Sequence, residues 1–201
     1  MPRSVGPIVD VLALFAIVAV AQTVVGVVGS ATGPFALSPP VADDPWTIAT
    51  SVYAHGGLGH LLSNSIALVL FGWPVARATT RLRFHVFFLL TGATAGIAQV
   101  WVMGILGAAA PVLGASGAIF ALLGYLLASN PVAEGVAASV DVPRWVVLGF
   151  FAVVAAGVTV ATMSPRAALV AHFTGLMLGL VGGRARVLQT PAAHPERRLV
   201  T

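Results

Sequence analysis

The sequence predicts an all-α, polytopic membrane protein, folded as a bundle of six transmembrane helices. Hydrophobic residues make up 58% of the 201 residues and charged residues only 8%, whereas soluble domains carry about 25% charged residues. A chain with so few charges cannot cover a water-facing surface, so we expect an integral membrane protein. The absence of cysteine excludes disulfides and thiolate metal sites.

Turn residues divide the hydrophobic sequence into six predicted spans. The spans cover residues 8–29, 56–76, 84–107, 116–130, 144–162 and 166–187. The first apolar run exceeds the usual hydrophobic stretch of a signal peptide, so we expect it to remain as a span. Asp43-Asp44-Pro45, Asn130-Pro131 and Ser164-Pro165 mark breaks. We therefore expect one membrane domain, residues 8–187, between tails 1–7 and 188–201.

The distribution of arginine predicts the orientation of this domain. If the N-terminus is cytosolic, Arg166 is the only arginine in the outer segments, and the other nine of the ten basic residues lie in inner segments. Such an excess of positive charge is typical of cytosolic loops. We therefore expect both termini in the cytosol. Because the sequence shows no transit-like leader, we expect a prokaryotic plasma membrane as the location. Spans two, four and six would then all enter from the outer face.

This topology places several polar side chains at one depth. His55, His60 and Asn64 lie at the start of span two, Ser116 opens span four, and His172 lies in the first turns of span six. His60 and Asn64 are one helical turn apart and share a face. At a rise of about 1.5 Å per residue, His172 lies on the order of 10 Å below the outer surface. The four groups His60, Asn64, Ser116 and His172 are thus expected to converge.

The fourth span is too short to cross the whole bilayer. From Ser116 to Asn130 it extends roughly 21 Å at helical rise, against a hydrocarbon core of about 30 Å. We therefore expect Ser116 to lie below the outer face, with residues 107–113 descending to it as irregular backbone. Such backbone is tolerated at depth only where protein buries it or where it lines a wet cavity.

A serine at a buried helix N-terminus is well placed for acyl transfer. The unpaired N–H groups there favour an oxyanion, and His172 could act as general base toward Ser116. No Asp or Glu lies near this layer, so only a Ser-His dyad is available. Gly117 and Gly124 in span four, with Gly175 and Gly179 in span six, would allow close helix contact. Considered alone, a serine in an apolar helix more often bonds a backbone carbonyl.

Three segments resemble the signatures of rhomboid intramembrane serine proteases. They read "WTIATSVYAHGGLGHLLSNSIALVLFG", "GASGAIFALLGY" and "AHFTGLMLGLVGG", and the resemblance extends from about Trp46 to Gly183. It implies that Ser116, within the Gly114–Gly117 motif, is the nucleophile and that His172 is the base. His60 and Asn64 are implied as oxyanion-hole side chains, together with the Ser116 backbone N–H.

The resemblance also assigns supporting roles and marks two departures. His55 matches an outer histidine whose role is structural or loop-ordering more often than catalytic. Phe120 stands where the family usually has Tyr, and its ring is expected to stack on His172. Thr47 stands where many members have Arg, which leaves open how the first loop is anchored. The implied substrates are transmembrane segments of other proteins, with no metal or nucleotide cofactor.

Two other functions remain open from the sequence. One is a catalytically inactive rhomboid-like protein that binds membrane clients. The other is a small transporter, although the lack of a carboxylate at mid-membrane depth argues against ion coupling. The arginines of the tail are expected to contact lipid headgroups rather than nucleic acid. We expect Asp10 and Gln99 to make interfacial or interhelical contacts, and His85 and His194 to be solvated.

Overall fold

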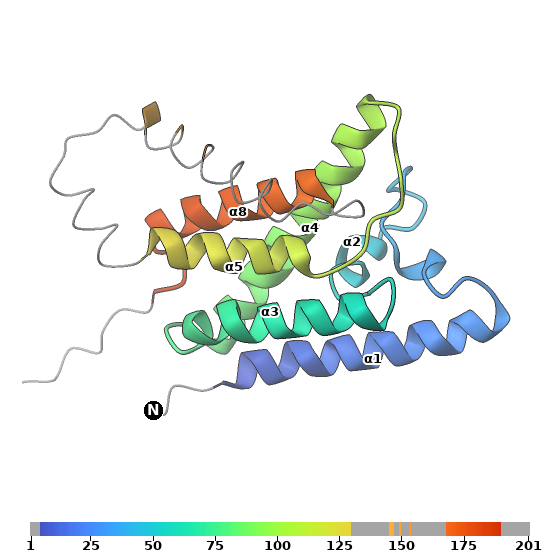
Figure 1. The fold of residues 1–201 in the computed structure, drawn as a ribbon, viewed down its shortest axis with the longest axis horizontal. Helices are drawn as coiled ribbons and strands as arrows, with labels where there is room; N and C mark the ends of the chain where they lie inside the picture. Colours follow the sequence, from blue (N-terminus) through green and yellow to red (C-terminus); the bar gives the residue numbers. More distant parts are fainter. Residues whose placement is uncertain (1–4, 130–144, 147–148, 150–152, 154–167, 190–201) are drawn as a thin grey trace, which may run out of the picture.

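A computed structural model describes residues 5–129, 145–146, 149, 153 and 168–189 of the chain. The named elements are α1 (Gly6–Val28), η1 (Gly33–Phe35), α2 (Thr47–Thr50), α3 (Leu58–Ala76), α4 (Arg81–Ile105), α5 (Ser116–Ala128) and α8 (Leu169–Arg184). Apart from one isolated β-bridge, the regular structure in these residues is helical (Figure 1). This agrees with the all-α prediction.

Five of the six predicted spans correspond to helices in the structure. They are α1, α3, α4, α5 and α8, in chain order. The fifth predicted span, 144–162, lies almost entirely outside the described residues, as does most of the tail at 188–201, so the six-span count stays a prediction. In the described part of the chain, α1, α3 and α4 are long and apolar enough to cross a membrane, whereas α5 and α8 are shorter. The protein is thus an integral membrane protein.

The shortness of α5 follows the prediction closely. The helix begins at Ser116 and has 13 residues, which corresponds to about 20 Å of helical rise. The preceding residues 108–114 are not helical. Their backbone is bonded to the first loop: Val112 and Leu37 exchange two N–H···O bonds of 2.8 and 2.9 Å, and Gly114 donates to the Ser51 carbonyl at 2.8 Å. Backbone bonds to the first loop therefore hold Val112 and Gly114 of this irregular segment, whereas residues 108–111 are exposed.

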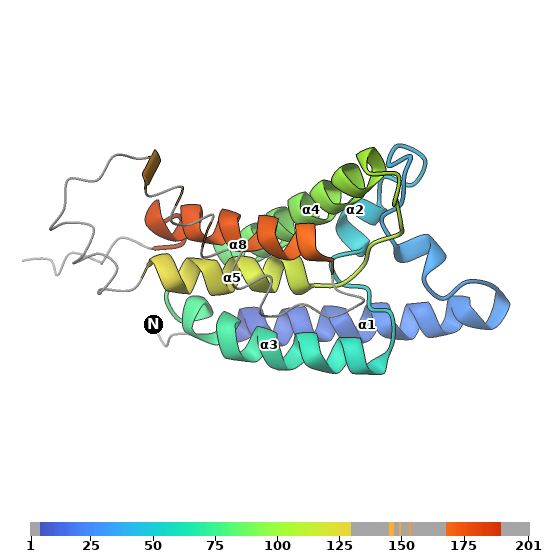
Figure 2. The same ribbon diagram turned by 45° about the horizontal axis from the view of Figure 1, so that its top comes forward.

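Among the helices that the structure describes, α5 and α8 form the most extensive contact. Figures 1 and 2 show them side by side, with α4 crossing them at an angle and α1 beside α3. A Cβ added at Gly175 would collide with the backbone of Gly117, and one added at Gly179 would collide with that of Ala121. Glycine at these positions lets the two backbones touch, which is the use of small residues in membrane helix packing.

The main hydrophobic core lies where α1, α3, α4 and α5 meet. Its largest fully buried side chains include Phe15 of α1, Leu68 of α3, Phe84 and Phe88 of α4, and Leu122 of α5. Because each of these helices contributes, the core fixes α3 and α5 relative to each other. These two helices carry His60 and Ser116.

The first loop is anchored without the arginine that is usual in the resembled family. Trp46 donates its indole Nε1–H to the Pro34 carbonyl at 3.1 Å. Thr47 is 1% exposed, and its hydroxyl donates to the Asp44 carbonyl at 2.6 Å. The hydroxyl of Thr47 thus closes a turn inside the loop, a role that a short polar side chain fulfils well.

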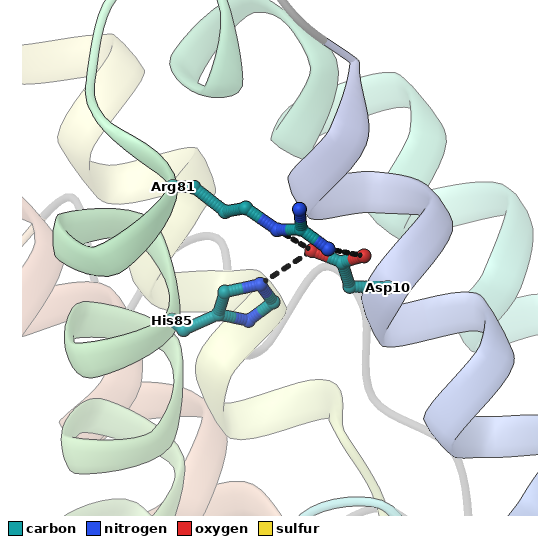
Figure 3. Close-up of polar contacts among 3 residues, drawn as sticks. All are labelled: Asp10, Arg81 and His85. Atoms are coloured by element: carbon teal, nitrogen blue, oxygen red, sulfur yellow. Dashed lines mark hydrogen bonds and ion pairs between the residues drawn. The ribbon is translucent and has the colours of Figure 1, made fainter.

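A polar cluster of Asp10, Arg81 and His85 joins the first turns of α1 to the first turns of α4, and Figure 3 shows the three side chains pointing toward one another. Arg81 makes a bidentate contact with Asp10, its Nε lying 2.6 Å from Oδ2, and His85 Nε2 lies 2.9 Å from the same oxygen. Asp10 therefore makes the interhelical contact expected of it. The expectation of a solvated His85 is wrong, because its side chain is only 27% exposed and pairs with Asp10.

Candidate active site

Ser116 and His172 are in direct contact. His172 Nε2 lies 2.9 Å from Ser116 Oγ. The serine is the first residue of α5, and the histidine lies one turn into α8 and is 9% exposed. The structure therefore brings together the two residues that the sequence proposed as nucleophile and base. At the start of α5, Ser116 is also next to N–H groups that the helix itself leaves unpaired.

Phe120 and the protein interior hold the His172 ring. The Phe120 and His172 rings stack with centroids 4.3 Å apart and planes 10° apart, as expected from their spacing. Among the described residues, the second ring nitrogen, Nδ1, has no hydrogen-bond partner. In this part of the chain the imidazole is therefore oriented by stacking and by its bond to Ser116. Within these residues no carboxylate bonds its Nδ1.

Gln99 of α4 caps the N-terminus of α8 one residue before His172. Its Oε1 accepts from the Ala171 backbone N–H at 3.1 Å. Ala171 is the third residue of α8 and 4% exposed, so its N–H is one of the four that a helix cannot bond internally. Gln99 thus makes the interhelical contact that was expected, and it fixes the helix turn that carries the base.

His60 is fixed against the backbone of the serine motif. Gly56 donates its N–H to His60 Nδ1 at 3.4 Å, which in a neutral ring places the proton on Nε2. Gly114 has φ of 126°, and a Cβ there would lie 2.6 Å from His60 Cε1. Only glycine therefore satisfies both the backbone conformation and the space occupied by the ring.

Asn64 lies beside His60 and shares its face of α3, as predicted. Its amide Nδ2 donates to the His60 carbonyl at 2.9 Å, and the residue is 5% exposed. An amide nitrogen carries two hydrogens, so this bond fixes the orientation of the group while using one of them.

One cavity connects these groups. It has a volume of about 680 Å³ and is lined by His60 and Asn64 of α3, Ser116 and Phe120 of α5, and His172 of α8. Ser63 of α3 and Leu113 also contribute to its wall. The predicted convergence of Ser116, His172, His60 and Asn64 is thus present in the geometry. A serine, a histidine and three further N–H donors around one cavity can support nucleophilic acyl transfer.

His55 does not line this cavity but packs against His60, which does. The residue is 5% exposed, and its ring packs edge-on against His60 at 5.1 Å and Phe15 at 4.6 Å. Its backbone bonds Gln22 of α1: the His55 N–H donates to Gln22 Oε1, and Gln22 Nε2 donates to the His55 carbonyl, both at 3.1 Å. The sequence analysis missed Gln22, although an amide within an apolar span was a usable signal.

Comparison with known proteins identifies the family. The family model described as "Rhomboid domain" matches residues 42–188. The chain therefore belongs to the rhomboid family, and the resemblance drawn from the three motifs is confirmed. It is similar to the "Rhomboid protease GluP" of Bacillus subtilis (strain 168), with 38% identity over 82 residues. That segment is 41% of this chain and only 15% of the relative's length. Helix α1 lies outside the matched residues.

Proposed function

We propose that this protein is an intramembrane serine endopeptidase that cleaves peptide bonds in or near transmembrane segments of other membrane proteins. The observation that carries the proposal is the 2.9 Å contact between Ser116 Oγ and His172 Nε2. Family membership and the likeness to a protein named as a rhomboid protease support it. The shared cavity with His60 and Asn64 adds the donors that acyl transfer requires.

In the first half of the proposed reaction, His172 Nε2 accepts the proton of Ser116 as Oγ attacks the scissile carbonyl carbon. The carbonyl oxygen becomes an oxyanion, which accepts hydrogen bonds from the Ser116 backbone N–H, His60 Nε2–H and the Asn64 amide. The C–N bond then breaks, and His172 returns the proton to the leaving amine. The product is an ester between Ser116 and the acyl half of the substrate.

Water completes the proposed reaction. His172 takes a proton from water as the oxygen attacks the ester carbonyl, and the same donors bind the second oxyanion. Collapse releases a carboxylic acid and restores the Ser116 hydroxyl with the proton held by His172. Each residue thus ends in its starting state, and the reaction requires no external cofactor.

The proposed substrate is a membrane segment that leaves helical form at the cleavage point. A helix buries its peptide bonds in internal hydrogen bonds, so Gly or Pro near the scissile bond should favour cleavage. The arginine distribution leads us to propose that both termini are cytosolic and that the cavity opens toward the exterior. Cleavage would then occur near the outer face of the membrane.

Purified protein in liposomes, mixed with a model transmembrane substrate, tests the proposal. We expect cleavage by the wild type and none by Ser116→Ala or His172→Ala. A fluorophosphonate should label the wild type at residue 116, mapped by mass spectrometry. Ser65 of the same helix as His60 donates its hydroxyl to the Leu61 carbonyl and does not line the cavity, so Ser65→Ala is the matched control and should cleave and label normally. Normal cleavage by folded Ser116→Ala would refute the dyad, and an unreactive wild type would favour the inactive, client-binding alternative.

A further inference from the structure

A two-point clamp connects α1 to the backbone in front of α3. The amide of Gln22 both accepts from the His55 N–H and donates to the His55 carbonyl, at 3.1 Å each. Its Nε2 also donates to the Ala31 carbonyl at 3.3 Å. Gln22 is 6% exposed, on a helix that is otherwise almost wholly apolar. A buried amide costs free energy unless its partners are present. The pair of bonds therefore fixes the position and the tilt of this backbone segment.

The clamp reaches His60 through a single peptide group. The carbonyl of His55 and the N–H of Gly56 belong to one planar unit. Gln22 Nε2 donates to the His55 carbonyl oxygen of that unit. The Gly56 N–H of the same unit donates to His60 Nδ1 at 3.4 Å. The bond from Gln22 to the His55 oxygen fixes the plane of this peptide group, and it therefore also fixes the direction of the Gly56 N–H toward the His60 ring. A carbonyl that accepts a bond also makes the N–H of its own peptide group a better donor.

The bond from Gly56 determines which nitrogen of the His60 ring carries the proton. When Nδ1 accepts from Gly56, the neutral ring carries its proton on Nε2. The Nε2 edge packs against Gly114, two residues before Ser116. The other tautomer would present a lone pair there and could not donate to an oxyanion. The His55 ring also contacts His60, and it makes edge contacts with both Phe15 and His60.

We propose that Gln22 is a positioning residue that holds His60 in the tautomer and orientation needed to donate from Nε2. It acts through the His55–Gly56 peptide group and touches no reacting atom. The inference rests on the proposed function for its catalytic consequence, while the tautomer of His60 can be observed without catalysis. Helix α1 lies outside the matched rhomboid domain. Through Gln22 it would help to position His60 in the candidate site.

The first experiment compares Gln22→Met with wild type in liposomes. Methionine keeps the length of the side chain but makes none of the three bonds, neither the two to His55 nor the one to the Ala31 carbonyl. Losing one oxyanion donor costs roughly 100- to 1,000-fold in kcat, and we expect a misdirected donor to cost less, about tenfold, with KM unchanged to within about twofold. Thr23→Val is the matched control, because Thr23 is exposed and bonds only the Ala19 carbonyl of its own helix. A loss of activity that merely follows the folded fraction would overturn the proposal.

A double-mutant cycle tests the route of the effect. In a His60→Ala background, Gln22→Met should lower the residual kcat by less than about twofold, because residues acting through a shared partner are not additive. A full additional tenfold loss would show that Gln22 acts by another path and would overturn the proposal. If Gln22→Met fails to fold, Gln22→Asn replaces it. Asparagine keeps the amide on a side chain that is one methylene shorter, which should lengthen its bonds to the His55 backbone.

A spectroscopic measurement separates the failure of this inference from failure of the proposed function. Nitrogen-15 NMR of histidine-labelled protein, assigned with His60→Ala, should show His60 protonated on Nε2 in the wild type. Gln22→Met should shift the ring toward a mixture of tautomers, and Thr23→Val should not. If the wild type proves inactive but the shift occurs, the clamp stands and the protease proposal falls. An unchanged tautomer in Gln22→Met would overturn the clamp whatever the activity.

Discussion

Gly175 of α8 packs directly on the backbone of Gly117 in α5, and this contact sets the separation of the helices at the candidate site. A Cβ added at Gly175 would collide with the Gly117 carbonyl group. The same turns of the two helices carry His172 and Ser116, whose side chains are 2.9 Å apart. The hydrogen bond between them therefore depends on the absence of a side chain at residue 175.

Gly175→Ala should separate the two helices and abolish most activity. Misplacement of reacting groups by about 1 Å can cost on the order of 100-fold in rate, so we expect a loss of at least that size. Overpacking should also lower the free energy of unfolding by about 1–3 kcal/mol. Cleavage rate and detergent unfolding measure both effects. Gly104→Ala on α4 is the control, because a Cβ there meets nothing within 4 Å; equal behaviour of the two variants would contradict the argument.

Gly114→Ala should disable the site by moving His60. Gly114 has φ of 126°, and its Cβ position lies 2.6 Å from His60 Cε1. Gly107 provides a matched control outside the cavity lining, since its φ is 68° but a Cβ there meets nothing within 4 Å. Both variants should lose about 1–3 kcal/mol of stability from backbone strain. Only Gly114→Ala should also lower kcat, by roughly 100-fold if the His60 donor is displaced. Similar kcat losses in both would show that strain alone matters.

The contact between Ser116 and His172 could be predicted from the sequence. Their depths follow from hydropathy and from the shared direction of spans four and six, and the glycines indicate where the two helices touch. The stacking of Phe120 follows from its place one turn after the serine. These features depend on spacing along a helix, which the sequence states directly.

The contacts of α1 could not be predicted in the same way. Its apolar residues surround the whole helix, so no polar face shows how the helix is rotated about its axis. Without that rotation, neither the clamp of Gln22 on His55 nor the pairing of Asp10 with His85 can be derived. The second omission explains why His85 was wrongly expected to be solvated. Tertiary packing decides such contacts, because the partners lie far apart in the chain.

Asp10→Asn should loosen the attachment of α1 to α4. The carboxylate of Asp10 contacts both Arg81 and His85, so the substitution removes the charge that pairs with both. Arg81→Gln removes only the more exposed partner, whose side chain is 68% exposed, and should destabilise less. Thermal unfolding in liposomes measures the stability of each variant. We expect the wild type to be the most stable, Arg81→Gln to be less stable and Asp10→Asn to be the least stable. Added salt should reduce the effect of Arg81→Gln, and a larger loss for Arg81→Gln than for Asp10→Asn would contradict this interpretation.

Gln99→Leu should leave the Ala171 N–H buried without its acceptor. Ala171 is 4% exposed, and an unsatisfied buried donor costs about 1–3 kcal/mol. We expect the free energy of unfolding to fall by that amount and kcat to fall as the first turn of α8, which carries His172, moves or frays. Gln99→Glu keeps an acceptor and places negative charge at a helix N-terminus, where it is favourable. It should therefore retain most of the activity, measured as cleavage of the same transmembrane substrate. If the Leu and Glu variants lose activity equally, the cap on Ala171 does not position the histidine.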